Sequence, residues 1–487
     1  MTLTLDHSYA TLPARFFSKQ APDPVASPTL IKTNSDLASL LNIDTKWLTS
    51  EEAIGYFSGN SLPPEIQSIS TVYAGHQFGT WNPQLGDGRA VLLGERKGKD
   101  GQLYDIQLKG AGRTPYSRGG DGRSPLGPVL REYILSEAMH ALGVPTTRSL
   151  AAVETGEQVY RETALPGAIL TRVASSHIRV GTFQFFSARQ DIEAVKTLYK
   201  YAAKRHFLET LEAENPVLAF LDAVIEKQAE LIAKWQCLGF IHGVMNTDNM
   251  LICGETVDYG PCAFMDTFSA KAVFSSIDHH GRYRYENQPK IAHWNLSWLA
   301  QSLLPLLHDD QEKAVEVAQE AIDQFPKKYT QAYQLGMAKK LGFESASETT
   351  VKLSDEFLHL LEKNAIDFTL GFRQLADLIT SDRQVEIPEH RLPKAFDKWL
   401  EEWRFALQSE HDMENITQSI RSTNPIFIPR NHLVEQAIHS AEYENSYAPF
   451  EQLVDLLSSP FEFNLASGDF ALPASDKERV YRTFCGT

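Results

Sequence analysis

The spacing of apolar residues predicts a strand-rich segment followed by a long helical one. Residues 1 to about 70 combine short apolar runs with several prolines, which indicates an irregular extension with one or two short helices. Between residues 71 and 124, the β-favouring runs 90–93 and 104–108 stand between glycine-rich turns, as in a small sheet.

Helical periodicity takes over after residue 124. Residues 128–142 repeat apolar side chains at helical spacing between an initial proline and a glycine just beyond the end. Residues 220–237 show the same periodicity and lead directly into a loop that contains His242. Further amphipathic segments are expected at about 291–307, 310–324, 351–380 and 431–441. This order predicts an α+β fold that is compatible with two lobes.

Composition narrows the class of protein. A chain of 487 residues that is 43% hydrophobic can bury a large core, and its net charge of −16 argues against an extended nucleic-acid or anionic-membrane surface. Its four cysteines show neither a disulfide framework nor a C-x-x-C pair, as expected in a reducing compartment. We see no signal peptide and no run of about 18 apolar residues, so we expect a cytoplasmic protein.

A basic, glycine-rich cluster lies between residues 107 and 124. Four cations stand there against the single acid Asp121, a local charge of +3; they are Lys109, Arg113, Arg118 and Arg123. Glycine lets backbone N–H groups approach a polyphosphate, and interleaved cations neutralise it, so the cluster indicates a phosphate-binding loop. A solvated, turn-rich loop is an equally good interpretation of this segment alone.

Several positions follow the order of protein-kinase motifs. The turn Gly86-Asp87-Gly88-Arg89 precedes Lys109 at a strand end, and a helix bearing Glu132 follows, so Lys109 and Glu132 are expected to pair. A second set, HGVMNTDN at 242–249 and then Asp258-Tyr259-Gly260, parallels H-R-D-x-x-x-x-N and D-F-G. This spacing assigns Asn249 and Asp258 as magnesium ligands and predicts that His242 is buried and organises the loop.

One departure from the kinase pattern concerns the base. The kinase base position is Val244, and valine cannot accept a proton, whereas a carboxylate stands four residues on at Asp248. Asp248 is therefore a candidate base at a shifted position, or alternatively a turn or capping residue. Arg172 and Arg179, seven residues apart, suit phosphate oxygens, with surface salt bridges as the alternative.

Taken together, the motifs resemble the selenoprotein O family in its bacterial, cysteine-containing form. The strings that carry the resemblance are QLKGAGRTPYSR at 107–118, HGVMNTDN at 242–249, VDYGP at 257–261 and NPIFIPRNH at 424–432. The resemblance covers nearly the whole chain and implies a protein-kinase-like fold with an inverted nucleotide. It implies an extension at 1–70, an N-terminal lobe with nucleotide-binding loops at 71–183, a helical C-terminal lobe at 184–420 and an extension at 421–487.

The resemblance also implies roles for the motif residues. The enzyme would transfer AMP from ATP to Ser, Thr or Tyr hydroxyls of proteins and release pyrophosphate, with Asp248 as base. Asn249 and Asp258 would bind Mg²⁺ or Mn²⁺, and Glu132 would position Lys109. The nucleotide site would comprise Gly86, Gly88, Arg89, Lys109, Asp121, Gly122, Arg172, Arg179 and Asp258. Transfer of UMP from UTP with manganese is a further expectation.

The family also carries a redox-active residue near its C-terminus. Here that position is Cys485, and we hypothesise a reversible disulfide with Cys262; two unpaired thiols are an equal alternative. A true kinase and a nucleotide-binding pseudokinase are the rival functions. The acceptor proteins and the oligomeric state cannot be read from the sequence.

Overall fold

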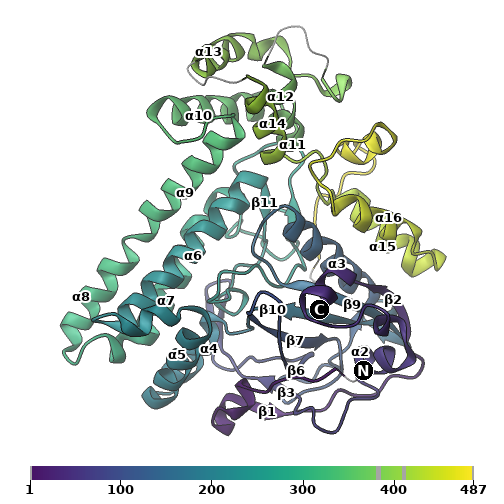
Figure 1. Cartoon of the computed structure of the whole chain (residues 1–487), viewed down its shortest axis with the longest axis vertical. Coiled ribbons are helices and arrows are strands. Elements are labelled where there is room, and N and C mark those ends of the chain that lie inside the picture. Colours follow the sequence, from purple (N-terminus) through teal and green to yellow (C-terminus); the bar gives the residue numbers. More distant parts are fainter. Residues whose placement is uncertain (1–2, 380–384, 409–412, 485–487) are drawn as a thin grey trace.

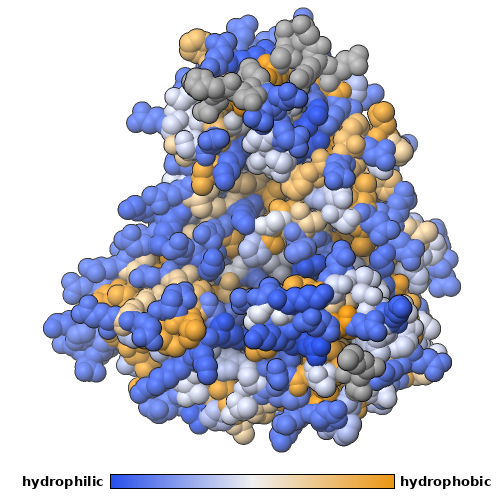
Figure 2. Space-filling model, in the orientation of Figure 1, coloured by the Kyte–Doolittle hydropathy of each residue, from blue (hydrophilic) through white to orange (hydrophobic). Residues whose placement is uncertain are grey.

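The computed structural model describes residues 3–379, 385–408 and 413–484. It has two lobes: a β-rich N-terminal lobe and a helical C-terminal lobe, with the long helices beside the sheet and the last helices folded back toward it (Figure 1). The face seen in Figure 2 is mainly hydrophilic, with hydrophobic residues in scattered groups, in keeping with the acidic composition.

One eight-stranded sheet forms the N-terminal lobe, in the order β1-β3-β6-β7-β10-β9-β2, with β8 paired to β10. Its strands are β1 (Phe17–Lys19), β2 (Thr29–Thr33), β3 (Ile69–Thr71), β6 (Ala90–Lys97), β7 (Leu103–Lys109), β8 (Ser124–Pro125), β9 (Arg148–Tyr160) and β10 (Ala164–Ala174). In the antiparallel pair β7–β10, Arg172 lies opposite Gln107. Since side chains alternate along a strand, Arg172 and Lys109 project from the same face of the sheet.

Helix α3 (Leu126–Ala141) covers this sheet and carries Glu132. Its apolar residues form one buried cluster with residues of β9, β10 and two C-terminal helices, α15 (Asn431–Glu444) and α16 (Ala448–Leu457). Arg131, also on α3, donates hydrogen bonds to the carbonyl oxygens of Gly260 and Cys262. The helix is therefore held between the sheet, the C-terminal region and the loop that follows Asp258.

The remaining helices are mostly in the C-terminal lobe. They are α1 (Ser35–Leu40), α2 (Glu51–Ser58), α4 (Val180–Ser187), α5 (Ile192–His206), α6 (Pro216–Leu238), α7 (Gln288–Leu307), α8 (Gln311–Ile322), α9 (Phe325–Lys340), α10 (Glu348–Lys363), α11 (Phe368–Arg373), α12 (Leu375–Leu378), α13 (Asp397–Leu407) and α14 (Met413–Thr423). Among the described residues, no helix has the length and apolar character needed to cross a membrane.

Local sequence signals set where α6 begins and where it ends, directly before the central loop. The Asn215 side chain caps its first turn, Pro216 opens it, and Gly239 closes it at φ 70°, where glycine carries no steric penalty. The short strands β11 (Phe240–Ile241) and β12 (Ala263–Phe264) then pair antiparallel. The residues between them, 242–262, contain both kinase-like motifs.

Two expectations about local structure were incomplete. The N-terminal region contains the expected α1 and α2, but β1 and β2 also join it to opposite ends of the sheet. The helix expected over 351–380 is broken, because Ala365 adopts φ 54° and Asp367 caps a new helix at Phe368. In both cases the pattern of apolar residues did not reveal where the backbone changes direction.

Candidate active site

A cavity of about 440 Å³ gathers the predicted site residues at the junction of the sheet and the central loop. Its lining includes Gly86, Gly88, Arg89, Lys109, Asp121, Gly122, Glu132, Arg172, Arg179, Asp248, Asn249 and Asp258. Val244, at the kinase base position, lines it as well. Residues from both halves of the kinase-like order thus share one cavity.

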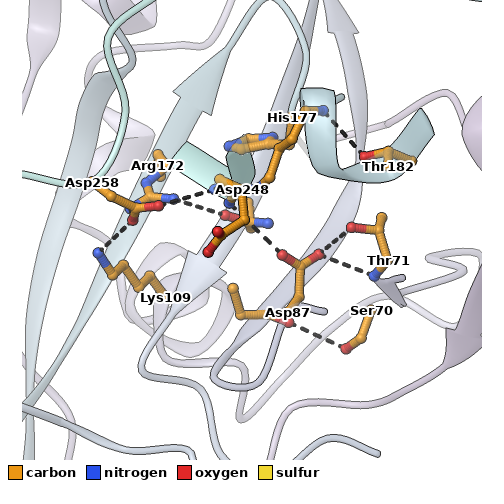
Figure 3. Close-up of polar contacts among 12 residues, drawn as sticks. Ser70, Thr71, Asp87, Lys109, Arg172, His177, Thr182, Asp248 and Asp258 are labelled. Carbon is orange, nitrogen blue, oxygen red and sulfur yellow. Dashed lines mark hydrogen bonds and ion pairs between the residues drawn. The ribbon is translucent and has the colours of Figure 1, made fainter. Parts of the chain in front are cut away.

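An ion cluster that includes Lys109, Arg172 and Asp258 lines this cavity (Figure 3). Lys109 Nζ lies 2.5 Å from Glu132 Oε2 and 3.1 Å from Asp258 Oδ1. Arg172 joins the same two carboxylates, with Nε 2.7 Å from Glu132 Oε1 and Nη2 2.7 Å from Asp258 Oδ1. The strand lysine and the helix glutamate therefore pair, and Arg172 reinforces the pair from the neighbouring strand.

Arg179 connects this ion cluster to the central loop. It precedes α4, and its Nη1 donates to Asp258 Oδ2 at 3.0 Å and to the Asp248 carbonyl oxygen at 2.5 Å. Its guanidinium also lies over the ring of Tyr73, 4.7 Å from the centroid. Arg172 on β10 and Arg179 on the following loop thus both contact Asp258.

Buried charges shift the acidity of the carboxyl groups. Burial alone would raise the pKa of Asp258, but Arg172, Lys109 and Arg179 together hold it well below its usual value. Glu132 behaves in the same way: its pKa is lowered because Arg172 and Lys109 outweigh the cost of burial. Both carboxylates are therefore ionised at neutral pH.

The central loop is organised around His242. This side chain is fully buried, its Nε2 lies 2.8 Å from the Val257 carbonyl oxygen, and its ring stacks on Trp235. Its Nδ1 accepts a hydrogen bond from the Val244 N–H, and burial lowers the pKa of the ring. His242 therefore ties the H-G-V turn to the residue before Asp258, and it is buried and organises the loop as the sequence pattern predicted.

Asp248 occupies a different environment from Asp258. Burial raises its pKa to about 6, although Arg179 lies nearby. Its Oδ2 accepts a hydrogen bond from Gln77 Nε2 at 3.1 Å, whereas its buried Oδ1 has no hydrogen-bond partner among the described residues. The side chain lines the cavity, and no cation pairs with its carboxylate within the described chain.

Several of the residues that line the cavity are glycines in tightly packed turns. Gly86, at φ 135°, lies directly under the ring of Tyr116, and a Cβ on Gly88 would come within 2.8 Å of the Tyr116 carbonyl oxygen. Gly122 has φ 69°, and a Cβ there would collide with the Gly112 backbone. These contacts explain why glycine occupies the turns that close the cavity.

The donor set suits a hard cation. Asn249 Nδ2 donates to the Val244 carbonyl oxygen at 3.1 Å, which leaves its Oδ1 for a ligand. Asp258 contributes an ionised carboxylate in the same cavity, at a backbone φ of 63° that turns the residue out of regular structure. One amide and one carboxylate oxygen fit Mg²⁺ or Mn²⁺ that takes its other ligands from phosphates and water.

Some contributors to the site were not assigned from the sequence. Asp87 accepts hydrogen bonds from the N–H and hydroxyl of Thr71 and lies 4.0 Å from Arg179. Arg161 pairs with Asp121 through two hydrogen bonds. The Gly-x-Gly turn pointed to Asp87, but nothing in the sequence pattern singled out Arg161.

The cysteine hypothesis is left open by the structure. Cys262 is fully buried, its Sγ donates to the Tyr259 carbonyl oxygen at 3.2 Å, and burial raises the pKa of its thiol to about 12. Cys485 lies outside the described residues. Thr483, shortly before it, donates to the Pro261 carbonyl oxygen, so the end of the described chain lies beside the Cys262 turn.

The fold and the site define a class. A β-rich lobe with a glycine turn, a strand lysine paired with a helix glutamate, and a His, Asn and Asp loop in a helical lobe constitute a two-lobed protein-kinase-like fold. Val244 at the kinase base position sets it apart from ordinary protein kinases.

Comparison with known proteins gives the family. The family model of protein adenylyltransferase SelO matches residues 1–458. A protein nucleotidyltransferase YdiU from Rhodopseudomonas palustris (strain HaA2) is 53% identical over 487 residues, which cover 99% of each chain. Another from Bacillus cereus (strain B4264) is 51% identical over 485 residues, 99% of this chain and 98% of the relative. The chain therefore belongs to the SelO family and is a protein nucleotidyltransferase.

Proposed function

We propose that this enzyme transfers AMP from ATP to a Ser, Thr or Tyr hydroxyl of an acceptor protein. The observation that carries the proposal is the convergence, in one cavity, of three cations, an ionised carboxylate and the separate carboxylate Asp248. Val244 leaves the kinase position without a base, so proton transfer falls to Asp248.

Each group has a part in the proposed reaction. Lys109, Arg172 and Arg179 bind the phosphate oxygens, and the glycine turns together with Arg89 and Asp121 surround the rest of the nucleotide. Asn249 and Asp258 hold Mg²⁺ or Mn²⁺, which neutralises phosphate charge and orients the triphosphate. Glu132 keeps Lys109 and Arg172 in place.

The bond changes are those of nucleotidyl transfer. Asp248 accepts the proton of the acceptor hydroxyl as its oxygen attacks the α-phosphorus. The bond between the α-phosphorus and the bridging oxygen breaks, and pyrophosphate leaves with its negative charge balanced by the arginines and the lysine. The product is a phosphodiester between AMP and the protein.

Labelled ATP tests this function directly. With ATP labelled at either the α or the γ phosphate, the α label is expected on protein, and intact mass should show an AMP adduct in the presence of magnesium. Protein that retains only the γ label would identify a kinase, and a wild type as inactive as Asp258→Ala would identify a pseudokinase. Chelation of divalent cations is expected to abolish labelling.

UTP and manganese provide a second measurement. The cavity binds the triphosphate through its phosphate oxygens, and none of the assigned contacts selects a base, so we propose UMP transfer as a secondary activity with manganese. Competition between α-labelled ATP and UTP under each metal measures the preference. Absence of UMP adducts under every condition would exclude it.

Redox control through Cys485 and Cys262 is a further proposal. Oxidant is expected to change the activity of wild type but not of Cys485→Ser. Cys237→Ser is a matched control, because Cys237 contacts the Tyr333 carbonyl oxygen, away from the cavity. Equal redox responses of wild type and Cys485→Ser would contradict the proposal.

A further inference from the structure

A small hairpin outside the main sheet contacts the central loop. Strands β4 (Gly75–Gln77) and β5 (Thr80–Asn82) pair only with each other, and Phe78 and Gly79 join them at φ 53° and 84°. Two-residue hairpin turns of this kind need positive φ at both central residues. Because an isolated two-stranded hairpin is marginally stable in water, its position depends on the surfaces that it contacts.

Three consecutive hairpin residues bond to three consecutive loop residues. The His76 N–H donates to Thr247 Oγ1 at 2.8 Å, and the Phe78 N–H donates to Asn246 Oδ1 at 3.0 Å. Between them, Gln77 Nε2 donates to Asp248 Oδ2 at 3.1 Å. The hairpin thus contacts the proposed base and the two residues before it.

Strand alternation separates the roles of the hairpin side chains. The His76 ring stacks on Trp298, with centroids 4.0 Å apart, and contacts Trp81 on β5. Gln77 projects from the other face of the strand and lines the active-site cavity. The aromatic contacts of His76 anchor the hairpin, and Gln77 is the residue that it presents to Asp248.

Gly75 shows how closely the hairpin approaches the base. Its backbone φ lies outside the positive region, so its lack of a side chain is not needed for conformation. A Cβ at this position would instead collide with the Asp248 carboxylate. On the other side, the Ala74 N–H donates to the Gly181 carbonyl oxygen at 3.0 Å, so the strand cannot move away freely.

We propose that Gln77 is a positioning residue for AMP transfer, whose amide holds the Asp248 carboxylate in the orientation that faces the acceptor hydroxyl. Among the described residues, it is the one side chain that donates a hydrogen bond to this carboxylate. Without it, no side-chain hydrogen bond from the described residues fixes the orientation of the carboxylate. The proposal rests on the proposed function, because it requires Asp248 to act on the acceptor.

Two variants remove the donor in different ways. Gln77→Glu keeps the shape of the side chain but loses the donated hydrogen bond, and Gln77→Leu removes the polar group without adding charge. Gln84→Glu is the matched control, since Gln84 is an exposed residue of the same segment and does not line the cavity. Gly75→Ala displaces the Asp248 carboxylate by a different route, because the added Cβ would collide with it.

The assay follows α-labelled AMP on protein at saturating ATP and magnesium. Both Gln77 variants are expected to lose about tenfold or more in kcat, the effect of one lost hydrogen bond to a charged group. Binding of a non-hydrolysable ATP analogue and the Tm should match those of Gln84→Glu. A merely structural role would lower the Tm or the analogue affinity together with kcat.

Two outcomes would overturn the inference. One is a kcat for either Gln77 variant within about twofold of the Gln84→Glu control. The other is a loss confined to KM for ATP, because it would place Gln77 in nucleotide binding. A wild type that attaches no α label would instead refute the proposed function, so the two failures are distinguishable.

Discussion

Asp248 and Asp258 line the same cavity, ten positions apart, yet their environments differ in kind. Asp258 accepts hydrogen bonds from Lys109, Arg172 and Arg179, which hold its pKa well below the usual value. Asp248 has a glutamine as its side-chain donor, and burial raises its pKa to about 6. Opposite surroundings therefore give two identical side chains different chemistry.

This difference shows how a kinase-like frame can serve another transfer. An ionised carboxylate surrounded by cations suits the binding of a metal ion, whereas a carboxylate whose burial raises its pKa suits proton transfer. Val244 leaves the kinase position without a base, and in the proposed reaction Asp248, four residues on, takes that role. Substitutions that affect nucleotide binding and AMP transfer differently test whether Asp258 and Asp248 have these separate roles.

The largest effect is expected from Asp258→Ala. Loss of the carboxylate removes the proposed metal ligand and leaves three cations without their shared counter-ion, so AMP transfer should fall by about 10⁴-fold or more. Analogue binding with magnesium, measured by calorimetry, should fall as well. Asp309→Ala, at an exposed position between α7 and α8, is the control and should behave as wild type. If Asp258→Ala still bound the analogue in a metal-dependent way, Asp258 would not have the binding role that distinguishes it from Asp248.

Asp248→Asn should affect chemistry alone. The amide keeps the size of the side chain but cannot accept the hydroxyl proton, so kcat should fall by about 10³-fold. The affinity for the ATP analogue should stay close to that of wild type, because the proposed phosphate contacts come from the three cations around Asp258. A parallel loss of nucleotide binding would show that Asp248 and Asp258 do not have separate roles.

Arg179→Lys should cause an intermediate loss of activity that affects both nucleotide binding and the chemical step. Arg179 Nη1 bonds to Asp258 Oδ2 and to the Asp248 carbonyl oxygen, and a lysine cannot reproduce the planar fork of the guanidinium. We expect kcat/KM to fall by about 10- to 100-fold, with changes in both kcat and KM. Arg391→Lys, an exposed conservative change, controls for lysine substitution. An effect on KM only would confine Arg179 to nucleotide binding.

The smallest effect is expected from Glu132→Gln. The amide has a single oxygen, so it can accept a hydrogen bond from only one of Lys109 and Arg172, and it no longer balances their charge; kcat/KM should fall by about tenfold. The loss should appear in KM for ATP more than in kcat, since Glu132 acts through the phosphate-binding cations. Steady-state kinetics with α-labelled ATP separate the two, and a fall in kcat alone would contradict this role.

Much of the site could be predicted from the sequence because its residues belong to short, ordered motifs. Lys109, Glu132, Asn249 and Asp258 stand at kinase-like spacings, and the structure brings all four to one cavity. The long amphipathic helices α6 and α7 were also found from apolar periodicity. These features depend on local spacing, which a linear pattern records.

Contacts between distant segments could not be predicted in this way. Gln77 and Asp248 are 171 positions apart, and nothing in either segment indicates that a glutamine amide meets a carboxylate. The edge strands β1 and β2 are short and poor in periodicity, so their pairing became visible only in the sheet. Arg161 likewise acquires its partner Asp121 from another turn.

The sequence by itself determined the order of the motifs, the presence of Val244 at the kinase base position and the carboxylate of Asp248 four residues on. The tertiary structure decided which of the two aspartates is surrounded by cations and which is left to a single amide. The physical reason is that the pKa of a carboxyl group depends on its burial and on charges within a few ångströms, and chain order does not fix those neighbours.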